Sequence, residues 1–345
     1  MNRHIAAPAE RKTSSDLGAA QPSGDLLSDD PDAALCVSRF RVGGVCVQLE
    51  GTRRCDVTLV PSLKPFRVVK SNPDITIQVQ WVAKLSPASG SKLFDSGSVW
   101  RLHEDETGFQ FDFSSPILGA RPYKKLVVDR HFSQATLQMS EEAFAGFPQV
   151  AEPLEYPLDE LLIMHRLTQE KAIELHGVGI VGPDSATNLF VGHSGAGKST
   201  IARLWTKLHD IEILSDDRII VRQDMVRQDM VREDEVRKGN AREDANRIFM
   251  YGTPWHGEAA FALPGRAPLQ RIFVLEHGQG NVLTRLSQGQ AVGELFARSF
   301  VPFHRHEYVD SALAFLQRVA SSIPCYRYAF EPDERAVEKV LNFRD

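Results

Sequence analysis

The stretch VGHSGAGKST at 191–200 constrains what this chain can fold into more than any other feature of its sequence. It matches G-x-x-x-x-G-K-[ST], a loop whose glycines let backbone N–H groups turn toward phosphate oxygens. In such a loop the lysine reaches the β- and γ-phosphates, and the serine hydroxyl can bind Mg²⁺. We predict a nucleoside triphosphate site with contacts from Gly192, His193, Ser194, Gly195, Ala196, Gly197, Lys198, Ser199 and Thr200.

The segments on either side of this loop have the pattern that the motif requires. LFVG precedes it as a short strand, TIARLWTKLH follows as a helix, and IEIL is the next strand. Strand, loop and helix in this order direct the partial positive charge of the helix N-terminus at the phosphates. The sequence therefore predicts an α/β fold around a bound triphosphate.

Length and composition narrow the class of protein. A chain of 345 residues favours two domains. The net charge of −5 is mild and no long basic stripe occurs, so we expect no nucleic acid partner. No apolar run approaches the length of a membrane span, and no secretory signal is visible. The four cysteines lack metal-binding spacing, which is typical of reduced thiols, and we expect a cytoplasmic protein.

Composition also changes along the chain. Residues 1–34 are rich in Ala, Pro, Ser, Gly and Asp, and we predict a disordered tail. Alternating apolar and polar residues at 35–153 predict a β-rich accessory domain, which leaves 154–345 as the catalytic domain. Within the latter, a VRQDM-type repeat at 221–247 predicts an exposed, charged insertion.

Two well-known users of the phosphate loop are disfavoured. A small GTPase needs N-K-x-D to read guanine, and this tetrapeptide does not occur, so we expect ATP. LSQGQ at 286–290 is close to the signature of ABC transporter ATPases, but no apolar strand ending in Asp-Glu follows it. We interpret LSQGQ as the end of a strand followed by the start of a helix.

An acidic pair, Asp216-Asp217 in LSDDRII, ends the strand that follows the phosphate-loop helix. Neighbouring side chains on a strand point to opposite faces, so one carboxylate can bind Mg²⁺ while the other faces an acceptor hydroxyl. Phosphoryl transfer to an alcohol needs both functions. The alternative, an ordinary ATPase in which one aspartate only caps a turn, stays open.

Together, His176-Gly177, the loop at 192–199 and the S-D-D-R at 215–218 resemble HPr kinase/phosphorylase, a bacterial enzyme that phosphorylates a serine of the phosphocarrier protein HPr. The resemblance implies a catalytic domain similar to that of phosphoenolpyruvate carboxykinase, an α/β fold with a mixed sheet. It implies that Lys198 holds the phosphates, that Asp217 is the general base and that His176 supports it. The Mg²⁺ ligands that it implies are Ser199, Asp216 and Glu258.

The acceptor is less defined than the donor. The resemblance implies a kinase for Ser or Thr of a protein or peptide, whereas the family's E-I-R-G-L-G element is absent, which argues against reverse phosphorolysis. A non-catalytic ATP-sensing module and a kinase of a small metabolite such as free serine are the alternatives, and a homo-oligomer is left open. Trp255-His256 in GTPWHGE either shape the acceptor pocket or form a packed turn, and we place His304 and His306 in an exposed loop.

Overall fold

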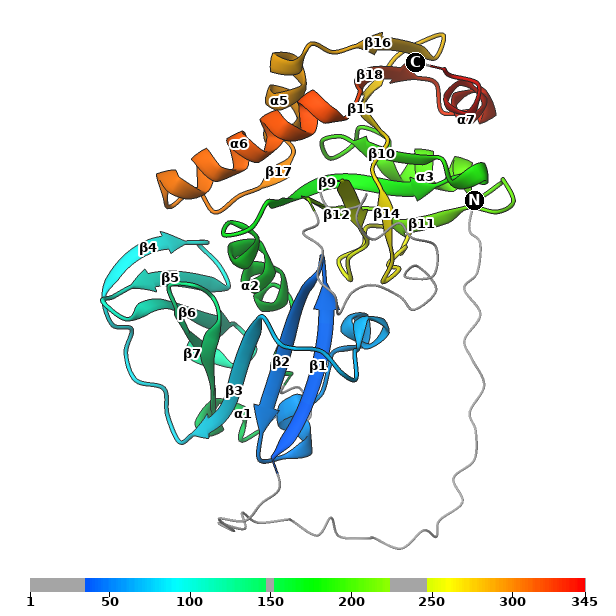
Figure 1. Cartoon of the computed structure of the whole chain (residues 1–345). Coiled ribbons are helices and arrows are strands. Elements are labelled where there is room, and N and C mark those ends of the chain that lie inside the picture. Colours follow the sequence, from blue (N-terminus) through cyan, green and yellow to red (C-terminus); the bar gives the residue numbers. More distant parts are fainter. Residues whose placement is uncertain (1–34, 147–151, 224–246, 345) are drawn as a thin grey trace, which may run out of the picture. The chain divides into compact units, whose positions relative to one another are not determined.

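The computed structural model describes residues 35–146, 152–223 and 247–344 (Figure 1). The predicted tail at 1–34 and most of the predicted insertion at 221–247 lie outside these residues. The prediction of an exposed insertion is wrong for residues 221–223, which are buried in a strand of the second sheet. The chain from Leu35 onward is one compact unit, so the division at 153/154 stays a prediction. In the described part, no helix is both long and apolar enough to cross a membrane.

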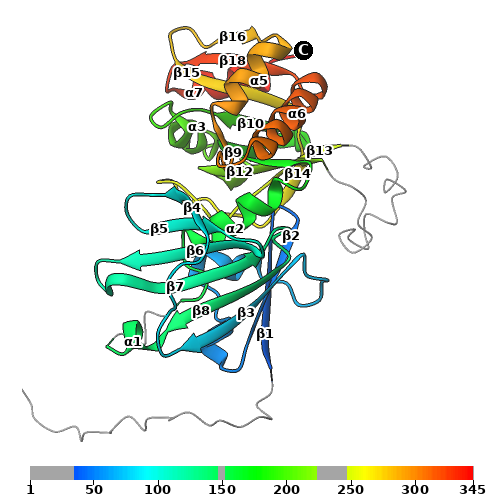
Figure 2. The ribbon, with the colours of Figure 1, turned by 90° about the vertical axis from the view of Figure 1, so that its left-hand side faces the viewer.

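The first half of this unit is β-rich, as its alternating pattern predicts. Its eight-stranded sheet has the order β1-β2-β3-β8-β7-β6-β5-β4 (Figure 2). The strands are β1 (Cys36–Val42), β2 (Val45–Gly51), β3 (Ile75–Val82), β4 (Ser91–Asp95), β5 (Trp100–Glu104), β6 (Gly108–Ser115), β7 (Gly119–Asp129) and β8 (Gln134–Ser140). Short helices are η1 (Arg54–Val57), η2 (Pro61–Phe66) and α1 (Glu141–Phe144). Strands β1 and β2 form a hairpin that turns at Gly43-Gly44, where φ is +57° and +80°.

The second half is built on a ten-stranded mixed sheet with the order β14-β13-β12-β9-β10-β15-β18-β16, while β11 and β17 also pair with β9. Strands β10, β15 and β18 are parallel, and the other pairs are antiparallel. The strands are β9 (Ala172–Val181), β10 (Thr187–Val191), β11 (Glu212–Ser215), β12 (Arg218–Gln223), β13 (Ile248–Tyr251), β14 (Arg266–Pro268), β15 (Arg271–His277), β16 (Val282–Arg285), β17 (Ser299–Phe300) and β18 (Cys325–Phe330).

Helices cover both faces of this sheet, because its strands are apolar on both sides. On β10, Phe190 packs with α3 (Lys198–Trp205) and α7 (Glu334–Leu341), whereas Leu189 packs with α5 (Gln288–Phe296) and α6 (His306–Ser322). Figure 1 shows these two pairs of helices on opposite sides of the sheet. Helix α2 (Leu158–Leu167) buries its apolar side in a third core, which it shares with the first sheet and with Ile220 of β12. The remaining short helix is η4 (Pro183–Ser185).

Two local interpretations can be compared with this fold. LSQGQ is the end of a strand and the start of a helix, since β16 ends at Arg285 and Ser287 caps α5 through a capping box with Gln290. The expectation of an exposed loop is wrong for His304, which is half-buried with its ring centroid 5.2 Å from that of His165. His306 is exposed, but it begins α6 and does not lie in a loop. Tyr308 and Ala312 of this helix pack inward.

Candidate active site

Strand β9 changes its neighbour on both edges near one residue, His176. On the first edge, β10 pairs as far as Gly177, and β17 takes over from Leu175. Between them, the His176 N–H donates to the carbonyl of Arg298 at 2.8 Å, and its carbonyl accepts from the N–H of Gly192 at 3.2 Å. The start of the phosphate loop and Arg298 therefore lie end to end along this edge.

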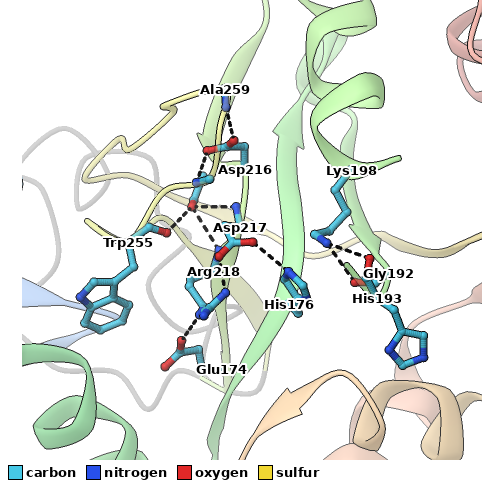
Figure 3. A network of polar contacts seen from close by, with 12 residues as sticks. Glu174, His176, Gly192, His193, Lys198, Asp216, Asp217, Arg218, Trp255 and Ala259 are labelled. Atoms are coloured by element: carbon cyan, nitrogen blue, oxygen red, sulfur yellow. Dashed lines mark hydrogen bonds and ion pairs between the residues drawn. The ribbon is translucent and has the colours of Figure 1, made fainter. Parts of the chain in front are cut away.

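The second edge of β9 has a matching break. Strand β11 ends where Ser215 pairs with Gly179, and β12 begins where Arg218 pairs with His176. In the gap, Gly177 donates its N–H to the carbonyl of Asp217 at 3.0 Å. Chain segments that leave a sheet at such a break form the crevices where α/β proteins bind ligands. The phosphate loop and the acidic pair thus flank one residue, as Figure 3 shows.

The phosphate loop has the backbone that its glycines predict. Gly195 and Gly197 have φ of +81° and +94°, and a Cβ on Gly197 would lie 2.5 Å from the ring of Phe330. Lys198, only 6% exposed, folds back so that Nζ donates to the carbonyls of Gly192 and His193, each at 3.1 Å. Burial lowers the pKa of Lys198, while the charge of Asp217 opposes this. Ser199 and Thr200 lie in the first turn of α3.

Asp217 is held by two cationic or donating side chains. Nε2 of His176 donates to one carboxylate oxygen at 2.8 Å, and the guanidinium of Arg218 pairs with the other. Burial raises the pKa of Asp217, but the hydrogen bond from His176 and the charges of Arg218, His176 and Lys198 outweigh it and hold the pKa below its ordinary value. Asp217 is therefore ionised at neutral pH.

Arg218 is fixed by more than Asp217. Its Nε lies 2.8 Å from Glu160 and 3.3 Å from Glu174, and its guanidinium lies 4.0 Å above the ring of Phe300. Glu174 is completely buried, and burial together with the charge of Glu160 raises its pKa well above the ordinary value. This network, which the sequence analysis missed, locks the orientation of Asp217.

Asp216 has a different environment from its neighbour. Its buried carboxylate accepts three backbone hydrogen bonds from the loop after β13: from Gly257 at 3.0 Å, Ala259 at 2.9 Å and Phe261 at 3.1 Å. These bonds use both oxygens, so Asp216 fixes the shape of the loop. The predicted ligand Glu258 lies on the same loop with an exposed side chain.

The donor atoms fit Mg²⁺ only in part. In the described residues, no three His, Cys, Asp or Glu side chains are grouped as metal ligands. Mg²⁺ on a triphosphate needs only one or two protein oxygens, because phosphates and water supply the rest. The Ser199 hydroxyl meets that need, whereas Asp216 already accepts three backbone hydrogen bonds and has one acceptor site left, on Oδ2.

Arg298 is a further site residue that no motif reveals. Its buried guanidinium donates to the carboxylate of Glu294 at 2.6 Å, while its Nε has no hydrogen-bond partner among the described residues. The charge of Arg298 is the main cause of the lowered pKa of His193, and it also lowers the pKa of Lys198. Arg298 therefore adds positive charge next to the phosphate loop.

The Trp255-His256 pair divides between its two interpretations. Trp255 is buried and donates its indole N–H to Asp159 at 2.9 Å, which makes it part of a packed turn. His256 is exposed and lines a surface cavity.

Neither models of known protein families nor curated proteins match this chain.

Proposed function

We propose that this protein is an ATP-dependent kinase that transfers the γ-phosphate to a Ser or Thr hydroxyl of a protein or peptide, on a catalytic fold of the HPr kinase type. The observation that supports this proposal most is that the phosphate loop and Asp217 lie on opposite sides of one residue, His176. The phosphate loop begins at one edge of β9, and Asp217 is hydrogen-bonded to the His176 side chain beside the other edge.

The donor half needs the loop to exchange internal contacts for phosphate oxygens. Lys198 would transfer its two hydrogen bonds from the loop carbonyls to the β- and γ-phosphates, which are stronger acceptors because they are charged. The N-terminus of α3 and the nearby charge of Arg298 favour the same anion. When bound, Mg²⁺ would neutralise charge on the β- and γ-oxygens, with the Ser199 hydroxyl as a ligand.

In the acceptor half, Asp217 would accept a hydrogen bond from the attacking hydroxyl and orient it at the γ-phosphorus. As the new O–P bond forms and ADP leaves, the hydroxyl proton would pass to the Asp217 carboxylate. The lowered pKa of Asp217 makes it a weak base, which suits a loose transition state in which proton transfer is late. His176 and Arg218 would hold the carboxylate in position.

One observation favours the second candidate, an ATP-sensing module without catalysis. Asp216, the expected metal ligand, accepts three backbone hydrogen bonds that shape the loop at 257–261. A protein that only senses ATP would bind it with the phosphate loop and would use Asp216 to hold this loop. The two functions differ in whether phosphate leaves ATP.

The test is transfer from γ-labelled ATP with Mg²⁺ to a mixture of serine-bearing peptides, followed by mass spectrometry. We expect phosphoserine with the unaltered full-length protein and none with Lys198→Met. Calorimetric binding of ATP, without transfer to any peptide, to HPr or to free serine and without hydrolysis, would instead identify the sensing module.

A further inference from the structure

A cavity of about 540 Å³ opens beside the acceptor half of the site. Three distant segments form its walls: residues 60–62 at the start of η2, residues 152–156 before α2, and His256 in the loop after β13. The cavity is open to solvent rather than enclosed, so an extended stretch of polypeptide can lie across it.

Two walls of this cavity connect it to Asp217. His256 precedes Gly257, whose backbone is so close to the acidic pair that a Cβ there would lie 3.3 Å from the Cβ of Asp217. On the other wall, Tyr156 is 62% exposed. Partial burial and then the charge of Glu160 raise the pKa of its phenol, while the charge of Arg218 opposes them. The wall that carries His256 therefore continues into the chain that packs against Asp217.

The cavity is acidic, in contrast to the phosphate loop. Glu152 and Glu155 line it, and the residues of its wall include no lysine or arginine. The charged group behind the wall is Lys124, whose Nζ lies 2.9 Å from the carboxylate of Glu155. Burial lowers the pKa of Lys124, and the charges of Glu155, Asp159 and Glu152 oppose this. Two carboxylates of the wall, Glu152 and Glu155, thus face one buried ammonium group, so the wall is negative overall.

We infer that the cavity binds a polypeptide acceptor that carries Lys or Arg within a few residues of its Ser or Thr. The basic side chain pairs with Glu152 and Glu155 and passes the exposed face of Tyr156, a ring that attracts cations. Anionic acceptors are repelled by the same wall. This inference rests on the proposed kinase function for the location of the hydroxyl, but the binding preference can be measured without transfer.

The experiment compares two fluorescent serine peptides of equal length, one with Lys at the flanking positions and one with Glu, by anisotropy with the full-length protein and an ATP analogue that cannot be cleaved. We expect the Lys peptide to bind about tenfold more tightly, from two or more surface charge pairs. Glu152→Gln should weaken it about threefold, and Glu152→Lys should abolish the preference. Glu338→Gln, an exposed glutamate on α7, is the matched control and should change nothing.

Equal affinity for the two peptides, or a preference that survives Glu152→Lys, would overturn the inference. Phosphate transfer to the same peptides is measured separately, so the two proposals fail differently. Charge-selective binding without transfer keeps the acidic cavity and contradicts the kinase. Transfer that ignores the flanking charge keeps the kinase and contradicts the role of the cavity.

Discussion

The two edges of β9 at His176 differ in charge and in construction. On the edge of β10, Lys198 and Arg298 bring positive charge to the phosphate loop. On the edge of β12, Asp217 belongs to a network in which Glu160 and Glu174 surround Arg218. In the proposed kinase, a triphosphate needs cations and a reacting hydroxyl needs a carboxylate, so one strand would separate the donor half of the site from the acceptor half.

The largest expected effect breaks the acceptor edge alone. Asp217→Asn keeps the shape of the side chain but removes the base, and we expect transfer to fall by about 10²- to 10⁴-fold while ATP still binds. Rapid-quench assays at saturating ATP measure the rate. Asp310→Asn, at an exposed position of α6, serves as the control. Unchanged transfer by Asp217→Asn would remove the acceptor role from this edge.

The second prediction breaks the donor edge. Lys198→Ala removes an ammonium group that would make two charged hydrogen bonds, and we expect ATP affinity to fall by about 100-fold. Calorimetry measures the affinity, and circular dichroism checks the fold. An affinity close to that of the unaltered protein would mean that the triphosphate does not lie in the loop.

The third prediction is that acid lowers the folding stability of the protein without lowering the transfer rate of the folded site. His165 is buried, and burial followed by the charge of His304 lowers its pKa to about 3, below the unfolded value of about 6.5. The unfolded chain therefore binds the proton first, and stability present above about pH 6.5 is lost as the pH falls toward 3. We expect His165 to account for a loss of about 2 kcal/mol at pH 5, which His165→Phe should prevent.

Urea unfolding at pH 7 and pH 5 measures that loss for both proteins. Asp217 stays ionised at pH 5, since its pKa is lowered, so the transfer rate per folded molecule should hold. An equal loss of stability in the two proteins would show that His165 already takes up its proton in the folded state.

A smaller effect sharpens the donor edge. Arg298→Gln should weaken ATP binding about tenfold and leave AMP binding unchanged, because in the proposed site only the distal phosphates would lie near the guanidinium. Arg327→Gln is a matched control, since Arg327 also pairs with Glu294, at 2.7 Å. Equal weakening by both variants would point to Glu294 and the structure of α5 as the cause.

The local structure of the proposed donor half could be predicted from the sequence because its residues are contiguous. Loop, helix and strand follow one another from Leu189 to Asp217, and local chemistry fixes each element. The acceptor half could be predicted only as far as His176 and Asp217. Glu160 comes from α2 and Glu174 from β9, and tertiary pairing alone brings them to Arg218.

Two limits of prediction have physical causes. Asp216 and Asp217 look equivalent in sequence, but backbone N–H groups of a loop more than 40 residues later occupy only the first. Arg298 follows an ordinary helix, and its place beside the phosphate loop depends on the pairing of β17 with β9. Neither of these long-range contacts leaves a recognisable pattern in the sequence near the residues that make it.

The central claim is that Asp217 and the phosphate loop face one nucleotide. The most direct test is calorimetric titration of an uncleavable ATP analogue, without Mg²⁺, into the unaltered protein and into Asp217→Asn. Removing a negative charge beside the phosphates should tighten binding by about threefold to tenfold, with a smaller change for AMP. Equal or weaker binding of the analogue by Asp217→Asn would contradict the claim.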